Sequence, residues 1–178
     1  MHMLIERLSR QFPGIEWRAA ESYGMPGIEV PAEMIIPVVE FLKNDPVLQM
    51  NFLTDLTAVH YPDEKGRELA VVYHLHGFVN NLRLRIKAFI PVANPEIDSL
   101  TGLFSAANWM ERETYDFFGV QFKGHPDLRR ILNVDDMDYF PLRKEYPLED
   151  ATRKDKDDRF FGRQGHEGVE FDKRVDRR

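Results

Sequence analysis

The segment from Asn51 to Ile90 constrains the fold of this chain most, because its apolar residues recur with a period of two. The pattern is clearest in residues 82–90, where leucine, isoleucine and alanine alternate with arginine and lysine. Such alternation is typical of a strand that packs one face on a core and exposes the other. We therefore predict three strands near residues 52–61, 68–76 and 82–90, with a hairpin loop at 77–81 between the last two.

A short amphipathic helix is predicted at the start of the chain, where apolar residues lie at helical spacing between Leu4 and Phe12. The dipeptide Pro13-Gly14 ends that pattern. Two short extended segments are expected to follow, around residues 15–19 and 27–30.

A second helix is predicted to end near Asn44, and Pro31 and Pro37 both suit its first turn, so two starting points remain open. The order of elements is then helix, two strands, helix and three strands. A chain with this order is expected to form a two-layer α+β domain around a mixed or antiparallel sheet.

After the three strands, residues 99–107 are expected to form one or two helical turns. A helix over Trp109–Phe118 is predicted next, because Asn108 is a suitable N-cap and Glu111 a suitable capping-box partner. Gly119 can adopt the left-handed conformation that ends many helices.

Three parts follow from these patterns: a globular α+β domain in 1–107, a helix with an irregular docking segment in 108–149, and a tail in 150–178. The tail carries charges of both signs and three spaced aromatic residues, Phe160, Phe161 and Phe171. A solvated disordered end is one interpretation. The other is an extended arm that becomes ordered on a partner, and the phenylalanines, as anchors, favour it.

Composition excludes several classes of function. The chain has no cysteine, which excludes disulfides, thiolate zinc sites, cysteine-ligated iron–sulfur clusters and thiol nucleophiles. A net charge of -6 argues against a general nucleic-acid binder. The N-terminus lacks the pattern of a signal peptide, and no apolar stretch approaches the roughly 20 residues of a spanning helix. We expect contact with a membrane only through a partner.

Charged residues are dense in the segment 109–132. On the predicted helix, Asp116 lies four residues after Arg112 and three after Glu113, so all three are expected to project from one side. The two carboxylates have the residue types of an acid/base pair or a hard-metal site. The segment also carries enough cations to neutralise them, so structural or interface ion pairs are favoured. Those cations are Arg112, Arg129 and Arg130.

Three histidines have residue types and positions that suit a metal site. His74 and His76 alternate on one predicted strand and His60 lies on the preceding one, as a three-imidazole face requires. No cysteine or carboxylate motif completes such a site. Exposed histidines on the polar side of the sheet, beside Arg83 and Arg85, are therefore the favoured interpretation.

Other catalytic patterns are missing from the sequence. There is no phosphate-binding glycine loop, dinucleotide fingerprint, nucleophile elbow or helical His-Glu-x-x-His, and hence no motif for NADH or flavin. His125, which precedes Pro126, is expected to anchor a turn rather than to transfer protons.

A long motif points to a family. Glu111-Arg-Glu-Thr-Tyr-Asp-Phe-Phe is followed, after six residues, by His125-Pro-Asp-Leu-Arg-Arg-Ile-Leu132. This motif resembles the hallmark of the C subunit of the proton-translocating NADH:quinone oxidoreductase, the 30 kDa subunit family of respiratory complex I. The resemblance continues in Pro141-Leu-Arg-Lys-Glu-Tyr-Pro-Leu148, and more loosely in residues 51–60. It covers most of the chain up to about Asp150.

The resemblance implies a peripheral-arm subunit that binds no cofactor itself, while partner subunits bind NADH, FMN, iron–sulfur clusters and quinone. Its main partner would be the D subunit of complex I, which with the B subunit forms the quinone cavity, and the C-terminal part would run over the D subunit. The complex would lie at the cytoplasmic side of the cell inner membrane and couple electron transfer to proton translocation. Residues of the motif would serve packing and subunit contacts: Glu111, Arg112, Glu113, Asp116, His125, Pro126, Arg129, Arg130, Pro141, Arg143 and Lys144.

One departure from the family and two alternatives remain. The chain has Tyr139-Phe140 where many relatives have Gly-His before the Pro-Leu-Arg segment. Related subunits occur in membrane-bound hydrogenase-type complexes, so an equivalent subunit of such a complex is one alternative. A stand-alone metal-dependent hydrolase that uses Glu113, Asp116 and the histidines is a remote one.

Overall fold

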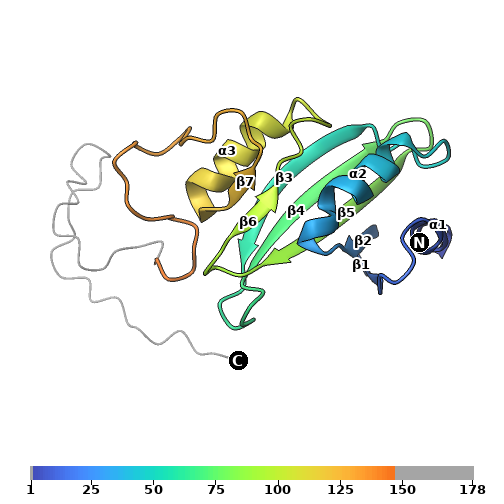
Figure 1. Ribbon diagram of the computed structural model, residues 1–178, viewed down its shortest axis with the longest axis horizontal. Coiled ribbons are helices and arrows are strands. Elements are labelled where there is room, and N and C mark those ends of the chain that lie inside the picture. The colour runs from blue at the N-terminus through green and yellow to red at the C-terminus, as the bar shows by residue number, and fades with distance from the viewer. Residues whose placement is uncertain (1, 147–178) are drawn as a thin grey trace, which may run out of the picture. The chain divides into compact units, whose positions relative to one another are not determined.

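The computed structural model describes residues 2–146, in which helices lie on one face of a five-stranded sheet (Figure 1). The elements, in chain order, are α1 (His2–Gln11), β1 (Arg18–Ser22), β2 (Met25–Glu29), the 3-10 turn η1 (Ala32–Met34), α2 (Ile35–Asn44), β3 (Phe52–His60), β4 (Leu69–Gly77), β5 (Leu82–Ile90), β6 (Glu96–Asp98), α3 (Ala107–Phe118) and β7 (Gln121–Lys123).

The sheet has the strand order β1-β2-β5-β4-β3. β2 and β5 are parallel, whereas the other neighbouring pairs are antiparallel, so the sheet is mixed. The predicted α+β class and the order of the first seven elements are confirmed. Both candidate prolines occupy a first turn, because Pro31 precedes η1 and Pro37 is the third residue of α2.

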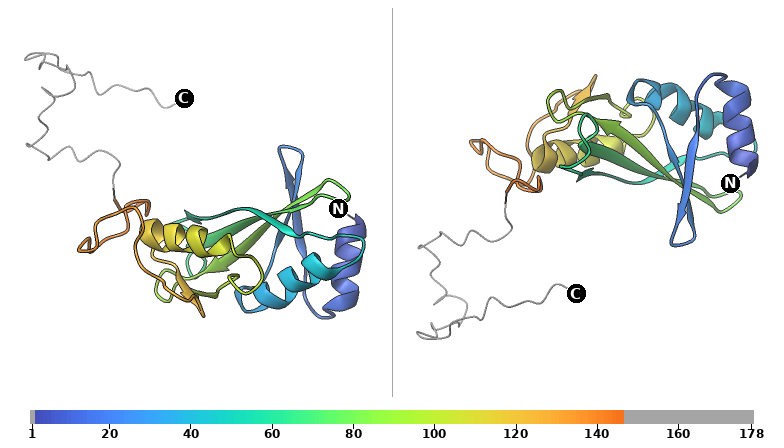
Figure 2. Two further views of the ribbon diagram at one scale, coloured as in Figure 1. Left: turned by 90° about the horizontal axis from the view of Figure 1, so that it is seen from above. Right: turned by 90° about the horizontal axis from the view of Figure 1, so that it is seen from below.

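The core lies between the sheet and the helices. Leu84, Ile86 and Ala88 of β5 are buried, as their alternation predicted, and they belong to one cluster with Val38 and Leu42 of α2. Burying a side chain of this kind stabilises the fold by roughly 1.5–3 kcal/mol. Figure 2 shows the helices on one side of the sheet, and no helix formed by residues 2–146 lies on the other side.

A register shift interrupts the pairing of β3 with β4 between Leu53 and Asp55. Leu53 faces the core before the shift, and the even-numbered residues Leu56 and Ala58 face it afterwards. The extra residue reverses which side chains of β3 point inward. His60 therefore lies on the core side of the sheet, away from the face that the sequence pattern assigned to it.

Three local features differ from the sequence predictions. Asn108 does not cap α3, because the helix starts at Ala107 and its N-cap position, Ala106, makes no side-chain cap hydrogen bond. The first extended segment is displaced to β1. The short parallel pair of β6 and β7 was not predicted, because strands of three residues carry no periodic signal.

The tail anchors Phe160, Phe161 and Phe171 lie outside the described residues, so the arm and the division into 1–107, 108–149 and 150–178 stay predictions. Within residues 2–146, no helix has the length and apolar character needed to cross a bilayer.

Candidate functional site

Helix α3, which carries the first half of the motif, packs along β3. The hydroxyl group of Thr114 lies 3.5 Å from the backbone oxygen of Leu56 in β3. Ala107 and Phe118, at the two ends of the helix, belong to the hydrophobic core. These contacts fix α3 on the sheet and leave its other side available to the segment 124–146, which has no helix or strand.

The C-terminus of α3 is closed by that irregular segment. Gly119 ends the helix with a φ of 76°, as predicted. A Cβ atom added there would lie 2.5 Å from the ring of Phe140 and 2.7 Å from the guanidinium of Arg143. Arg143 also donates a hydrogen bond of 2.7 Å to the backbone oxygen of Phe118. Phe140 thus packs directly over the end of the helix.

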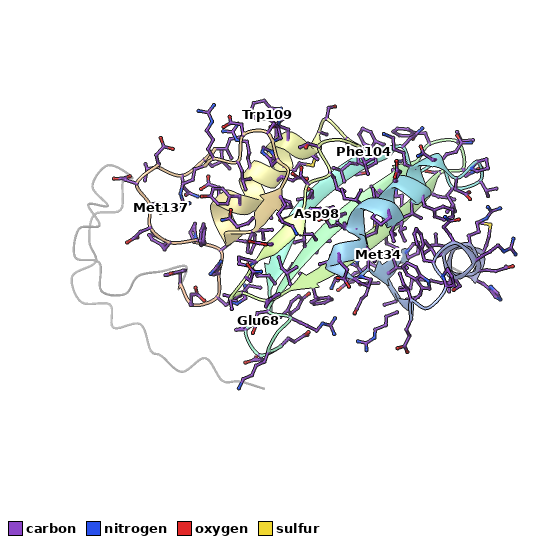
Figure 3. The ribbon with its side chains drawn as sticks, viewed as in Figure 1. Met34, Glu68, Asp98, Phe104, Trp109 and Met137 are labelled. Carbon is purple, nitrogen blue, oxygen red and sulfur yellow. The ribbon has the colours of Figure 1, made fainter. Side chains whose placement is uncertain are left out.

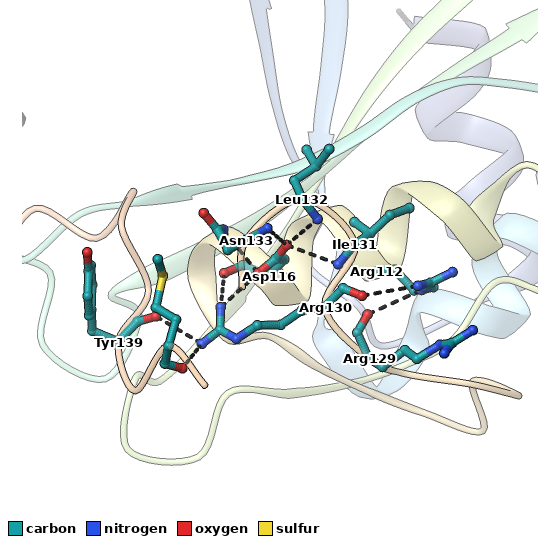
Figure 4. Close-up of polar contacts among 9 residues, drawn as sticks. Arg112, Asp116, Arg129, Arg130, Ile131, Leu132, Asn133 and Tyr139 are labelled. Carbon is teal, nitrogen blue, oxygen red and sulfur yellow. Dashed lines mark hydrogen bonds and ion pairs between the residues drawn. The ribbon is translucent and has the colours of Figure 1, made fainter. Parts of the chain in front are cut away.

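Asp116 is the centre of the contacts between α3 and the irregular segment (Figure 4). Its side chain is fully buried and accepts five hydrogen bonds. The guanidinium of Arg130 donates over 2.7 Å and the amide of Asn133 over 3.0 Å to one oxygen. The backbone N–H groups of Ile131, Leu132 and Asn133 donate to the other oxygen, over 3.1, 2.8 and 2.9 Å.

These hydrogen bonds determine the charge of Asp116. Burial alone would raise its pKa, but the backbone N–H groups of Asn133 and Leu132, with the side chains of Arg130 and Asn133, outweigh burial and lower the pKa well below its ordinary value. The carboxylate is therefore ionised and fully bonded. A buried, satisfied ion pair of this kind holds a geometry rather than binding a substrate.

Two arginines hold the backbone of the irregular segment. Arg130 donates to the backbone oxygens of Met137 and Tyr139 over 2.6 and 3.0 Å, in addition to Asp116. Arg112 donates to the backbone oxygens of Arg129 and Arg130 over 3.2 and 3.1 Å. Carbonyl groups that regular secondary structure would satisfy are here satisfied by guanidinium groups.

Glu111 binds the chain that enters α3. It is fully buried and accepts hydrogen bonds from the Ser99 hydroxyl over 2.6 Å and from the Leu100 backbone N–H over 2.7 Å. Burial raises the pKa of Glu111 to about 7, although both hydrogen bonds act in the opposite direction. The buried Tyr73 hydroxyl has no hydrogen-bond partner among residues 2–146. Burial and the nearby Glu111 and Asp98 raise its pKa well above the ordinary value, so it stays neutral.

The prediction that Arg112, Glu113 and Asp116 project from one side is wrong for Glu113. Arg112 and Asp116 face the irregular segment, whereas Glu113 is exposed. Arg112 and Asp116 lie four residues apart, on one face of the helix, and the irregular segment covers both. That segment does not extend to Glu113. Because the oxygens of Asp116 already accept five protein donors, the two carboxylates do not form an acid/base or metal-binding pair.

The three histidines do not share a face. His60 is buried on the core side, where its Nδ1 atom accepts a hydrogen bond of 3.0 Å from the Lys144 backbone N–H. His74 lies 3.6 Å from Asp55, and His76 lies 3.1 Å from Asn81, both on the opposite side. Among residues 2–146, no group of three or more His, Asp or Glu side chains could hold a metal ion.

His125 anchors a turn, as predicted. Its Nδ1 atom accepts a hydrogen bond of 3.0 Å from the Asp127 backbone N–H, so Nε2 is the donor to the backbone oxygen of Asn108 at 3.1 Å. Arg129 forms an exposed ion pair of 2.9 Å with Asp127. Of the remaining motif residues, Pro126 and Lys144 are exposed, whereas Pro141 is half-buried.

Apolar side chains are exposed mainly along α3 and the irregular segment. Of the eleven large apolar residues that are exposed in the described part of the chain, six belong to residues 109–146. They are Trp109, Leu132, Val134, Tyr139, Leu142 and Tyr146, called the docking surface below. Figure 3 labels Trp109 on α3 and Met137 on the irregular segment. Apolar residues that gather into one exposed patch are typical of a surface that contacts another protein, and the rings of Tyr139 and Tyr146 lie 4.9 Å apart.

Sequence reasoning did not find Ser99 or Asn133 as parts of this arrangement. Ser99 and Asn133 are polar residues outside the motif, and their roles depend on long-range contacts. The change to Tyr139-Phe140 did single out Phe140, whose ring lies 6.1 Å from that of Tyr115 and 4.7 Å from the guanidinium of Arg143. The departure from the family pattern is thus accommodated by aromatic packing over Gly119.

Comparisons with known proteins identify relatives over most of the chain. A family model described as the 30 kDa subunit of the respiratory-chain NADH dehydrogenase matches residues 28–152. The C subunit of the NADH-quinone oxidoreductase of Geobacter sulfurreducens is 42% identical over 148 residues, which cover 83% of this chain and 90% of the relative. The C subunit from a Nocardioides species is 47% identical over 116 residues, and the match spans 65% of this chain but only 46% of that relative.

Solved structures with the same fold were also found. A trypsin-resistant fragment of Nqo5 matches with a TM-score of 0.60 and 30% identity, over 71% of this chain and all of the fragment. A chain of an archaeal membrane-bound sulfane sulfur reductase matches with a TM-score of 0.67 over 83% of this chain and 85% of its own. At 24% identity, the second match shows a shared fold alone.

Proposed function

The chain belongs to the 30 kDa subunit family of the respiratory-chain NADH dehydrogenase, and from this premise we propose that it is a non-catalytic, peripheral-arm subunit of an NADH:quinone oxidoreductase. The proteins named as its relatives are subunits of an oxidoreductase complex. Its role in that complex is to support assembly and to hold the quinone-site subunits in place, while other subunits carry out the electron transfer that is coupled to proton translocation.

One observation carries the proposal: the buried pair of Asp116 and Arg130 holds an irregular segment whose apolar side chains stay exposed. The pair is only 2.7 Å apart and nearly free of solvent. Rigid presentation reduces the entropy that a surface loses on binding, so a segment fixed in this way is suited to assembly. The two buried acids of the motif, Asp116 and Glu111, are committed to internal contacts, which supports a structural role.

We propose the D subunit of the complex as the partner of the docking surface, with the B subunit and the other peripheral-arm subunits nearby. The partner subunits then bind NADH, FMN, the iron–sulfur clusters and quinone. Membrane contact occurs through the complex, at the cytoplasmic side of the cell inner membrane. A chain without cysteine has no ligand for a cysteine-bound iron–sulfur cluster, which supports this distribution.

An equivalent subunit of a hydrogenase-type membrane complex is the second candidate. The observation in its favour is the shared fold with a chain of a membrane-bound sulfane sulfur reductase. The names of the sequence relatives favour NADH:quinone oxidoreductase. Partners recovered with the tagged chain from mild-detergent extracts, together with NADH:quinone activity, distinguish the two.

The test of the docking surface replaces Leu132 and Val134 by serine. Both side chains are 63–65% exposed, so the isolated chain should unfold at an unchanged temperature. Binding to the purified D subunit should weaken at least roughly tenfold, because apolar contacts at the centre of an interface contribute most of the affinity.

The matched control replaces Phe78 and Val79 by serine. These residues are 60% and 67% exposed but lie in the loop between β4 and β5, distant in sequence from the docking surface. We expect the control to bind like the unaltered chain. Equal binding by both double variants would exclude the docking surface as the contact with the D subunit.

A further inference from the structure

The sheet has a second face, opposite to the helices, on which residues 2–146 place no helix (Figure 2). The strand register determines which side chains it presents. In β5, Arg83, Arg85 and Lys87 alternate with the buried core residues, and the pairing places Arg83 beside His76 and Arg85 beside His74. The neighbouring strands β1, β2 and β3 contribute their outward-facing residues in the same way.

This face is basic on a chain that is acidic overall. The outward-facing residues of the strands include four cations, namely Arg18, Arg83, Arg85 and Lys87, and two carboxylates, Glu29 and Asp55. Four minus two leaves an excess of two positive charges, whereas the whole chain has a net charge of -6. A local excess of positive charge attracts an acidic surface and repels a basic one.

The internal ion pairs on the face leave part of this charge available. Glu29 lies 2.8 Å from Arg67 and 3.9 Å from Arg18, and Asp55 lies 3.6 Å from His74. Within the described part of the chain, Arg83 and Arg85 form neither an ion pair nor a hydrogen bond through their guanidinium groups. Two neighbouring guanidinium groups without internal partners are suited to binding carboxylates from outside.

A hollow beside Arg85 provides space for an acidic side chain. It is lined by Ala20 and Gly27, by the cations Arg18, Arg85 and Lys87, and by Glu29, whose carboxylate is paired with Arg67 over 2.8 Å. A Cβ atom added at Gly27 would lie 3.1 Å from the Ala20 backbone oxygen and 3.5 Å from the guanidinium nitrogens of Arg85. Because Gly27 has no side chain, the space beside the guanidinium of Arg85 stays open.

We propose that this basic sheet face binds an acidic segment of a protein partner, with carboxylates paired to Arg83 and Arg85. Half-buried apolar residues, Val59 and Phe89, lie among the cations, as at protein interfaces in which charged groups surround an apolar centre. The inference goes beyond the proposed function, because this face is distinct from the docking surface on α3. Failure of either proposal leaves the other intact.

The experiment uses the full chain in its assembled complex and compares two double charge reversals. R83E/R85E changes the basic sheet face, and R10E/K123E makes the same change of charge at exposed positions on α1 and β7. Retention of the chain in the detergent-extracted complex is measured against rising salt concentration. We expect the dissociation constant to rise at least roughly tenfold for R83E/R85E, to rise less for R83Q/R85Q, and to stay unchanged for R10E/K123E.

A photoreactive residue at Thr57, on the outward side of β3, identifies the partner segment. We expect a cross-linked peptide rich in Asp and Glu, and reversal of those acids to Lys should restore the retention of R83E/R85E. A peptide without acids, a failure to restore retention, or equal retention of the two charge reversals would overturn the proposal. Vesicles of phosphatidylcholine and phosphatidylglycerol test the alternative of a lipid surface. If they bind the unaltered chain but not R83E/R85E, the face contacts lipid and the proposal of a protein partner is overturned as well.

Discussion

At the scale of single residues, two buried acids of α3 are stabilised in opposite forms. Asp116 accepts five hydrogen bonds, including one from a guanidinium, so its carboxylate is favoured. Glu111 accepts two hydrogen bonds and pairs with no cation among residues 2–146, so burial dominates and favours its neutral form. Burial favours the neutral form of both acids, and the number and charge of the donors decide whether burial is outweighed.

Glu111 predicts a dependence of stability on pH. Its pKa is raised from 4.5 to about 7 in the folded state, so the folded chain binds this proton more tightly than the unfolded chain does. The contribution of Glu111 to stability is therefore full below about pH 4.5, falls as the pH rises through about 7, and is constant above that. The loss amounts to about 3 kcal/mol for a shift of this size.

The E111Q variant tests this dependence, because glutamine stays neutral and keeps an acceptor for the Leu100 N–H. Urea unfolding between about pH 5 and about pH 8 should show a smaller fall in the free energy of unfolding for E111Q than for the unaltered chain. E113Q, an exposed position on the same helix, is the control and should leave the fall unchanged. Parallel curves for E111Q and the unaltered chain would contradict the prediction.

At the scale of elements, the end of α3 depends on one glycine for two reasons. Gly119 has a φ of 76°, which L-residues with a side chain rarely adopt, and Phe140 occupies the space that a Cβ would need. The helix end and the irregular segment therefore fit together only around a glycine. The first requirement was visible in the sequence, whereas the second is a tertiary contact.

The G119A variant separates these two requirements when it is compared with G66A. Gly66 has a φ of 79° but nothing within 4 Å of an added Cβ, so G66A reports the backbone strain alone, about 1 kcal/mol. We expect G119A to lower the free energy of unfolding by about 2 kcal/mol or more, because the ring of Phe140 must also move. In the double variant G119A/F140A the part of the loss that comes from the ring of Phe140 should disappear, and a strictly additive double variant would contradict this account.

At the scale of the whole molecule, the described residues already contain a complete hydrophobic core. The core cluster extends from Leu4 to Phe122, and the segment 124–146 closes over its end. Two separate surfaces, the docking surface and the basic sheet face, remain outside that core. A protein built in this way can contact one partner on each side without rearranging its interior.

Removal of the charged tail is predicted to leave this core intact. A chain that ends at residue 149 should unfold at the same temperature as the full chain, because the core cluster of residues 2–146 is built from side chains between Leu4 and Phe122. Its binding to the D subunit should nevertheless weaken, because the sequence assigns Phe160, Phe161 and Phe171 to partner contacts. Equal affinity of the two chains for that partner would refute the role of the tail as an arm.

The sequence alone determined the three α-helices and the strands of the five-stranded sheet, but not β6 and β7. Alternation in residues 82–90 identified β5 and its inward face, helical spacing identified α1 and α2, and Gly119 identified the end of α3. The motif identified the family. These features depend on the conformational preferences of a few neighbouring residues, which a sequence displays directly.

Only the tertiary structure decided what the motif residues contact. The register shift after Leu53 turned His60 inward, and Asp116 and Glu111 found donors 11 to 17 residues away along the chain. The pairing of β2 with β5 joins strands that are separated by a helix and two further strands. Such contacts depend on how the elements pack and which polar groups become buried together, and no local pattern of residues encodes that.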